Sequence, residues 1–281
     1  MSNFLFLVKQ SIIALILLFS FRMVDAQQQN FGGNRINFLV DGHPGFVVQP
    51  PDPAKKGRKP WVWYAPTIGN YPNKSNVWLM ERLVQKGFWI CGMDVGESMG
   101  NPEGCRLFSM FYDTLMIRYQ LDKKGCLIPQ SRGGLMLFNW AEDPANSNKV
   151  SRIAGIYPVC NLRSYPNLSK AAAEYGVNPD SFEIHLKKYN PIDKLESLLK
   201  ADVKIFIIHG DNDKVVPLNQ NSQIVYDRYK AIGGDIKLVV IPGKGHEEIP
   251  EYFQSEELLK FILNELSGRP EKRKKNNFDK N

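Results

Sequence analysis

Residues 127–135 read LIPQSRGGL, and this short stretch carries most of the information about the fold. An apolar run ends at Pro129, and Ser131 follows it, with two glycines close behind. Such a strand–serine–glycine pattern before an amphipathic segment is typical of the tight elbow that exposes a serine hydroxyl between a strand and a helix. A small residue usually stands two places before the serine, where this sequence has proline. Proline at the last position of a strand removes at most one ladder hydrogen bond and favours an extended Ile128, so we expect the turn at Ser131 to form.

Apolar, β-branched and aromatic runs on both sides of this elbow predict further strands. With the elbow's own strand they are RINFLV (35–40), GFVVQP (45–50), PWVWYAP (60–66), FWICGMDV (88–95), GCLIPQ (125–130), RIAGIYPV (152–159), VKIFIIHG (203–210) and IKLVVIPG (236–243). Helical patterns lie between them at NVWLMERLVQKG (76–87), GCRLFSMFYDTLMIRYQL (104–121), GGLMLFNWAED (133–143), NQNSQIVYDRYKAIGG (219–234) and IPEYFQSEELLKFILNEL (249–266).

The alternation of strands and helices predicts an α/β fold, with a mostly parallel central sheet of about eight strands and helices on both faces. The first two strands flank DGHP (41–44) and are expected to form an antiparallel hairpin at one edge. Residues 161–200 interrupt the alternation after the sixth strand and carry only weak helical patterns. We interpret them as a small cap-like insertion in a single domain spanning residues 27–268.

The two ends of the chain have a different composition. A lysine, an apolar run from Ser11 to Phe21 and the small-residue motif ending at Ala26 predict a secretory signal peptide over residues 1–26. The apolar run is short for a membrane span, so we expect no stable span after cleavage, with an uncleaved anchor as the alternative. Residues 269–281 form a basic tail, expected to be disordered, that contributes +4 of the net charge of +7. The protein is therefore expected to be secreted or periplasmic.

Composition argues against several classes of site. No basic stripe interleaved with aromatic residues is present, so we expect no nucleic-acid partner. The sequence has no phosphate-binding glycine loop, dinucleotide fingerprint or zinc spacing, so we expect no cofactor and no metal. Three of the four cysteines, Cys91, Cys126 and Cys160, lie in or beside strand-like runs and are interpreted as buried free thiols. Nothing in the sequence determines the oligomeric state.

Two later motifs complete a constellation with Ser131. HGDNDKVVP (209–217) follows the seventh strand and offers Asp211 and Asp213, while IPGKGHEEIP (241–250) places His246 in a loop before the last helix. Because the carboxyl ends of parallel strands meet at one edge of a sheet, we expect the three motifs to converge there. Spacing alone leaves both aspartates open, and His209, at a strand end, is interpreted as structural.

Together the three motifs resemble the α/β-hydrolase superfamily, in particular its dienelactone-hydrolase-like and prolyl-oligopeptidase-like branch, over roughly residues 35–266. In that branch HG-x-x-D-x-x-VP carries the acid and G-x-G-H carries the histidine. The resemblance implies an exported serine hydrolase in which Ser131 is the nucleophile, His246 the general base and Asp213 the acid that orients it.

The residues around the elbow suggest supporting roles. The backbone N–H of Arg132 is expected to form half of an oxyanion hole, and the N–H of Thr67 or Ile68, in APTIGNYP (65–72), the other half. The Arg132 side chain could bind a substrate carboxylate, but we favour a structural pair with Asp94 or Glu97.

Aromatic residues near the strand ends could line a pocket. Tyr71, Tyr112 and Tyr157 are candidates for the pocket wall, although aromatic side chains there are more often part of the core.

Three functions remain open on the sequence. The leading hypothesis is a secreted serine hydrolase that cleaves a carboxylic ester of a small molecule or an acylated carbohydrate through an acyl-enzyme. A prolyl-oligopeptidase-like peptidase is the first alternative, although only about ten residues separate the predicted cleavage site from the first strand, too few for a propeller. A non-catalytic binding protein on a hydrolase scaffold is the second, and Pro129 is its main support.

Overall fold

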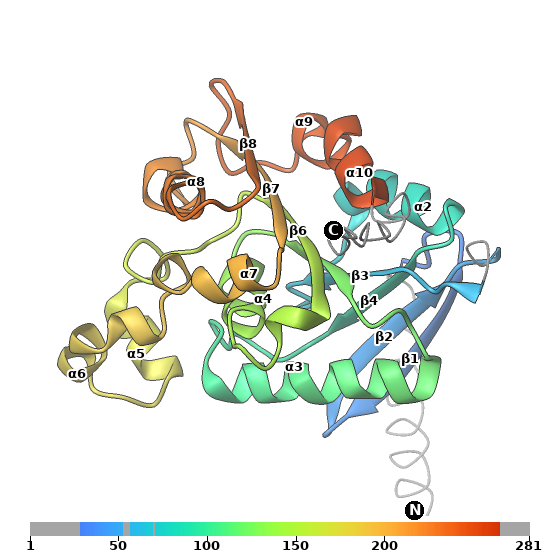
Figure 1. The fold of residues 1–281 in the computed structure, drawn as a ribbon, viewed down its shortest axis with the longest axis horizontal. Coiled ribbons are helices and arrows are strands. Elements are labelled where there is room, and N and C mark those ends of the chain that lie inside the picture. The colour runs from blue at the N-terminus through green and yellow to red at the C-terminus, as the bar shows by residue number, and fades with distance from the viewer. Residues whose placement is uncertain (1–28, 53–56, 70, 265–281) are drawn as a thin grey trace, which may run out of the picture.

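Eight strands form one sheet in the described part of the chain (Figure 1). The computed structural model describes residues 29–52, 57–69 and 71–264, so the predicted signal peptide and basic tail lie outside the described residues. The strands are β1 (Asn34–Val40), β2 (His43–Gln49), β3 (Trp61–Ala65), β4 (Trp89–Met93), β5 (Gly125–Pro129), β6 (Val150–Ile156), β7 (Lys204–Gly210) and β8 (Ile236–Ile241). Their order across the sheet is β1-β2-β4-β3-β5-β6-β7-β8.

The first two strands make the expected antiparallel hairpin. Val40 pairs with His43, and the two residues between them, Asp41 and Gly42, both have positive φ. Positive φ at both central positions matches the two-residue turn that suits the twist of paired strands. β2 then pairs antiparallel with β4, and the remaining neighbours are parallel. The predicted α/β-hydrolase fold, a mostly parallel sheet with an antiparallel pair at one edge, is confirmed.

Helices cover both faces of this sheet. The α-helices of the described residues are α2 (Val77–Gln85), α3 (Pro102–Thr114), α4 (Gly133–Ala141), α5 (Leu168–Glu174), α6 (Pro179–Ile184), α7 (Glu196–Lys200), α8 (Ser222–Ala231), α9 (Pro250–Phe253) and α10 (Glu256–Leu263). The buried apolar side chains of α3, of α8 and, apart from Leu135, of α4 belong to one hydrophobic cluster, and those of α2, α9 and α10 belong to another. Every residue of β3, β4 and β5 is buried, because parallel strands in the middle of such a sheet are covered on both faces.

Two predicted helices differ from those observed. The run 104–121 gives α3, which begins at Pro102 after the Asn101 cap, and then a π-helical turn, Leu115–Tyr119. The run 249–266 gives two helices, because α10 starts anew at Ser255, whose hydroxyl accepts the Leu258 N–H. Its last two residues lie outside the described chain.

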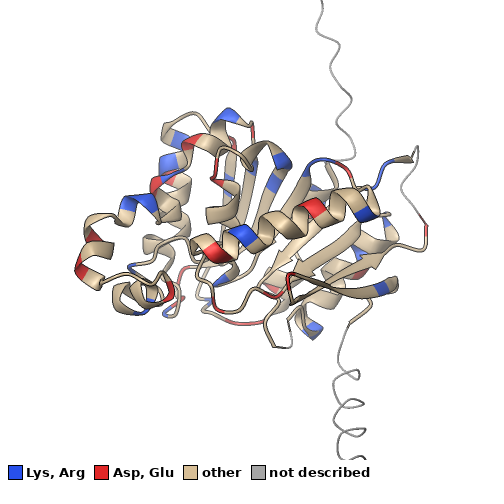
Figure 2. Ribbon diagram, turned by 90° about the horizontal axis from the view of Figure 1, so that it is seen from below, with Lys and Arg blue, Asp and Glu red and all other residues tan. Residues whose placement is uncertain are grey.

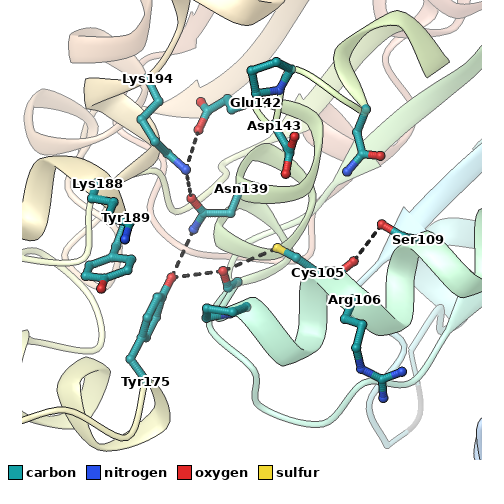
Figure 3. A pocket seen from close by; sticks show the side chains of 14 residues that line it. Cys105, Arg106, Ser109, Asn139, Glu142, Asp143, Tyr175, Lys188, Tyr189 and Lys194 are labelled. Carbon is teal, nitrogen blue, oxygen red and sulfur yellow. Dashed lines mark hydrogen bonds and ion pairs between the residues drawn. The ribbon is translucent and has the colours of Figure 1, made fainter.

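The insertion at 161–200 is more helical than expected, and its buried apolar residues form a small cluster with Leu135 of α4 and Val216. Phe182 is fully buried, and its ring stacks on Tyr189 with centroids 5.3 Å apart. The insertion contacts α4 through Asn139, which donates to the Tyr175 hydroxyl at 3.3 Å and accepts from Lys194 at 2.6 Å (Figure 3). A cavity of about 480 Å³ lies between α3, the C-terminal end of α4 and the insertion.

Charged and sulfur-containing side chains are distributed without large clusters. Figure 2 shows acidic and basic positions interspersed along the described chain. None of the four cysteines forms a disulfide in the described structure, and Cys91, Cys126 and Cys160 are buried. Within the described ranges, no group of three or more histidine, cysteine or acidic residues could hold a metal ion. No helix of those ranges is long and apolar enough to cross a membrane.

Candidate active site

The turn after β5 has the geometry of a nucleophile elbow. β5 ends at Pro129, which pairs with Ala65 of β3, and the Gln130 N–H continues the ladder by donating to the Ala65 carbonyl at 2.9 Å. Ser131 follows with φ of 49°, a left-handed conformation that is strained for a residue other than glycine. The chain enters α4 two residues later. The proline thus leaves the sharp turn intact.

Two glycines make this turn sterically feasible. A Cβ atom on Gly133 would lie 2.0 Å from the Ala65 carbonyl oxygen, and one on Gly134 would lie 2.3 Å from the Val159 carbonyl oxygen. Both distances are far below a normal contact, so the backbones of β3 and of the segment after β6 can approach the elbow only because these positions lack side chains.

Ser131, His246 and Asp213 form a continuous hydrogen-bonded chain. The Ser131 Oγ lies 2.9 Å from His246 Nε2, and His246 Nδ1 lies 2.7 Å from Asp213 Oδ2. The three residues come from the loops after β5, β8 and β7, so they meet at the carboxyl edge of the sheet. An ionised aspartate beside Nδ1 keeps the proton on that nitrogen and leaves the Nε2 lone pair for the serine hydroxyl.

The two aspartates left open by the sequence have separate partners. Asp211 Oδ1 accepts the Gly243 N–H at 2.7 Å. Asp213 is buried, and its Oδ1 accepts the N–H groups of Val215 and Val216 at 2.9 and 2.8 Å. Burial alone would raise the pKa of Asp213, but hydrogen bonds from His209, His246 and Val216 hold that pKa well below its usual range. Asp213 is therefore ionised at neutral pH.

A second imidazole lies behind Asp213. His209 is fully buried, with Nε2 3.3 Å from Asp213 Oδ2 and 2.9 Å from the Val216 carbonyl oxygen. Its Nδ1 lies 2.7 Å from Ser222 Oγ at the start of α8. His209 thus connects β7 and α8 to the loop that carries Asp213.

The elbow leaves one backbone donor free. The N–H groups of Ser131, Gly133, Gly134 and Leu135 all donate to carbonyl oxygens, whereas the Arg132 N–H has no backbone acceptor within the described residues. On the facing loop after β3, Pro66 and Tyr71 line the pocket. The Thr67 side chain lies against Gly92 of β4, and Ile68 packs on the core. The oxyanion roles of the Thr67 and Ile68 N–H groups stay a prediction.

The Arg132 side chain is engaged by a carboxylate. Its guanidinium donates to Glu97 at 2.5 Å, while Asp94 accepts the N–H of Gly96 within its own loop at 2.8 Å. The pair therefore forms with Glu97 and not with Asp94, because the Asp94 carboxylate closes a local turn.

A pocket of about 230 Å³ opens beside the serine hydroxyl. Its wall includes Tyr71 and Tyr157, two of the three candidate tyrosines, whereas Tyr112 packs in the core against Trp61 and Trp140. The Tyr157 ring lies 4.4 Å from the His246 ring, centroid to centroid, and holds the imidazole in place.

Other residues of the pocket were missed by the sequence analysis. Buried Gln130 accepts hydrogen bonds from Tyr64 and Asn76 at 2.7 and 3.0 Å, directly before the serine. Tyr165 comes from the insertion, and Val215 and Glu248 follow Asp213 and His246 by two positions each. The proximity of Val215 and Glu248 to predicted site residues was the signal that could have found them.

Comparison with known proteins identifies the family of the chain. The profile of the Prolyl oligopeptidase family matches residues 118–268, more than half of the chain and the part that carries all three residues of the hydrogen-bonded chain. The chain belongs to the prolyl oligopeptidase family. A search of curated proteins gives no match.

Solved structures of other proteins share the fold of this family member. A puromycin-hydrolyzing peptidase of Mycobacterium tuberculosis is 14% identical with a TM-score of 0.63, over 85% of this chain and 40% of its own. A truncated carbohydrate esterase from gut microbiota is 15% identical with a TM-score of 0.64, over 86% of this chain and 99% of its own. Est1E from Butyrivibrio proteoclasticus is 17% identical with a TM-score of 0.60, over 84% of this chain and 100% of its own. The chain thus spans less than half of the peptidase, and these likenesses show the fold alone.

Proposed function

We propose that this serine hydrolase cleaves a carboxylic ester through an acyl-enzyme on Ser131. Ser131 Oγ attacks the ester carbonyl while His246 takes its proton and then returns it to the leaving alcohol. Asp213 stabilises the imidazolium, and the Arg132 N–H donates to the developing oxyanion. Water activated by His246 then releases the acid and regenerates the serine.

The hydrogen-bonded chain from Ser131 to Asp213 is the observation that supports this mechanism. A serine hydroxyl is a weak nucleophile until a base accepts its proton, and His246 Nε2 lies at 2.9 Å, within reach of that proton. The buried, ionised Asp213 fixes the tautomer in which His246 can act as a base. The strained φ of Ser131 points to the same role, since strain of this kind persists where a side chain must be presented.

Labelling with a fluorophosphonate tests the mechanism directly. We expect the wild-type protein to be modified at Ser131 and the Ser131→Ala variant not to be labelled, with its ester hydrolysis reduced by roughly 10⁵- to 10⁶-fold. Mass spectrometry of the labelled peptide identifies the modified residue. A folded wild-type protein that remains unlabelled would instead support a binding protein on a hydrolase scaffold.

A peptidase is the second candidate, and membership of the prolyl oligopeptidase family favours it. Esters and amides pass through the same acyl-enzyme, so the leaving group separates the two functions. p-Nitrophenyl esters and p-nitroanilides with the same acyl group provide a matched comparison. We expect turnover of the esters; turnover of aminoacyl or peptidyl anilides at comparable kcat/KM would establish the peptidase.

We further propose that the protein is exported and acts on an acylated carbohydrate. Support for export comes from the sequence of residues 1–26, and the carbohydrate substrate is inferred from that location. N-terminal sequencing of protein purified from the native host should begin at Gln27. Acetate release from acetylated oligosaccharides, compared with aryl acetates, tests the substrate.

A further inference from the structure

Glu248 places a carboxylate in the wall of the pocket beside Ser131. The residue lies two positions after His246, in the loop between β8 and α9. Three neutral groups from the loop before α2 donate to it: the Tyr71 hydroxyl at 2.8 Å, the Asn73 amide at 3.0 Å and the Ser75 hydroxyl at 2.7 Å. These donors fix the position of the carboxylate, but they do not cancel its charge.

The charge of Glu248 is fixed at neutral pH. Burial would raise the pKa of its carboxyl, but the hydrogen bonds from Ser75, Tyr71 and Asn73 lower that pKa below its ordinary value. Within the described part of the chain, Glu248 has no ion-pair partner. The positive charge of the exposed Lys74 also lowers the pKa of Glu248, but Lys74 lies beyond ion-pair distance from it.

The other charged side chain of the pocket is already neutralised. Arg132 lines the pocket, but its guanidinium pairs with Glu97, which is not a pocket residue, and this carboxylate balances its positive charge. His246 carries no charge when it is ready to act as a base. The uncompensated charge in the pocket wall is therefore negative.

Burial and the negative charge of Glu248 raise the pKa of two neighbouring tyrosine hydroxyls. Burial, the hydrogen bond to Glu248 and its negative charge together raise the pKa of Tyr71 to about 12. Burial and then the charge of Glu248 raise the pKa of Tyr157 above its usual value. Tyr165 adds a third ring to the wall. Aromatic faces attract organic cations, and a carboxylate among them strengthens that attraction.

We propose that Glu248 and the three tyrosine rings form a subsite for an organic cation, such as an ammonium group, carried by the substrate. The inference rests on the proposed function, because it names the charge of the molecule that Ser131 attacks. Substrates with an anion at the same position are disfavoured, since a carboxylate of fixed position would repel them.

Matched thioesters test the subsite. Thioacetates of 2-(trimethylammonio)ethanethiol, of 3,3-dimethylbutanethiol and of 3-mercaptopropionate have cationic, neutral and anionic leaving groups, the first two of the same shape. Each is hydrolysed by water to acetate and a thiol that can be assayed. In wild-type protein we expect kcat/KM of the cationic thioester to exceed that of the neutral one by about tenfold at low ionic strength, and less in high salt.

The Glu248→Gln variant removes the charge and preserves the size of the side chain. We expect its preference for the cationic over the neutral thioester to fall to within about twofold of unity, because the attraction is electrostatic. Glu251→Gln is the matched control: Glu251 lies in the same segment but pairs with Lys244 outside the pocket lining, so the preference should be retained. A wild-type preference near unity, or equal losses in both variants, overturns the proposal.

Binding of tetramethylammonium separates this inference from the proposed function. Saturation-transfer NMR needs no turnover, and we expect a signal in wild-type protein that is lost in Glu248→Gln, with tert-butanol as the neutral control. Binding without labelling of Ser131 would contradict the proposed function and support the subsite. Hydrolysis of neutral esters without tetramethylammonium binding would contradict the subsite and leave the proposed function standing.

Discussion

At the scale of single residues, Asp211 and Asp213 show how position decides role. They lie two places apart in one loop, yet Asp211 accepts the N–H of Gly243 in the loop after β8, while Asp213 is buried and hydrogen-bonds to His246. Their spacing in the sequence could not show which of them contacts His246, because both follow β7 and both could reach the same edge of the sheet. The pattern HG-x-x-D-x-x-VP favoured Asp213, and Asp213 is the aspartate that lies within hydrogen-bond distance of His246.

Substitution of each aspartate by asparagine tests the assignment. In Asp213→Asn the amide presents a donor or a neutral acceptor to His246 and cannot stabilise the imidazolium, so we expect kcat to fall by about 10³- to 10⁴-fold. Asp211→Asn retains an acceptor for the Gly243 N–H, and its kcat should stay within about threefold of wild type. Steady-state kinetics on one ester suffices, and equal losses in the two variants would contradict the assignment.

At the scale of elements, the elbow was predictable in outline because its parts are adjacent in sequence. The apolar strand, Ser131 and the two glycines lie within one stretch, and each has a local steric reason. The pocket wall was much less predictable. Glu248 and its partner Tyr71 are 177 residues apart, and only the convergence of two loops brings them together. The break before α10 was also missed, although Ser255 carried a visible N-cap signal.

The elbow itself can be tested at Gly133. A methyl group there would meet the Ala65 carbonyl oxygen, so Gly133→Ala must displace β3 or α4. We expect a loss of about 1–3 kcal/mol in the free energy of unfolding, together with slower fluorophosphonate labelling. Gly245→Ala is the control, since its Cβ would lie 3.6 Å from the nearest atom, and its free energy of unfolding should change by less than about 1 kcal/mol. Urea unfolding measures both.

At the scale of the whole molecule, two buried carboxyl groups make the stability of the fold depend on pH in opposite directions. Asp213 has a lowered pKa, so its contribution is present above the ordinary aspartate pKa and is lost as pH falls toward the lowered value. Glu142, at the end of α4, has a pKa raised well above the ordinary value by burial, which Lys194 only partly offsets. Its oxygens lack hydrogen-bond donors in the described structure, and Lys194 Nζ lies 3.6 Å away (Figure 3).

Replacement of Glu142 by glutamine tests the pH dependence of stability that we attribute to Glu142. With a raised pKa, the stability due to protonated Glu142 is present below the ordinary glutamate pKa and is lost as pH rises toward the folded value. The glutamine of Glu142→Gln cannot ionise. We therefore expect the free energy of unfolding of this variant to exceed that of wild type by an amount that grows to on the order of 1–3 kcal/mol between pH 5 and pH 8. Glu196→Gln, an exposed neighbour on α7, should show no such gain. Urea unfolding measures the free energy of unfolding of both proteins across this pH range. A difference between wild type and Glu142→Gln that did not change with pH would contradict the expectation.

The topology of the molecule was largely predictable, whereas the insertion was not. Long apolar strands alternate with amphipathic helices, and that pattern alone indicates a parallel sheet. Residues 161–200 form short helices whose individual patterns are too brief to predict, and these pack around Phe182 in a small core that is shared with Leu135 of α4. Their packing on Asn139 of α4 depends on tertiary contacts that no local pattern records.

The contacts of His209 give the hydrogen-bonded chain a direction. The Val216 carbonyl oxygen can only accept, so His209 Nε2 carries a proton, which lies between that oxygen and Asp213 Oδ2. The other partners of Asp213 on its buried side, the N–H groups of Val215 and Val216, are donors as well. No base therefore lies behind Asp213 to accept a proton from it. In the proposed mechanism, a proton taken from Ser131 stays on His246 until the leaving group accepts it, so the departure of the leaving group is the way in which that proton leaves the site.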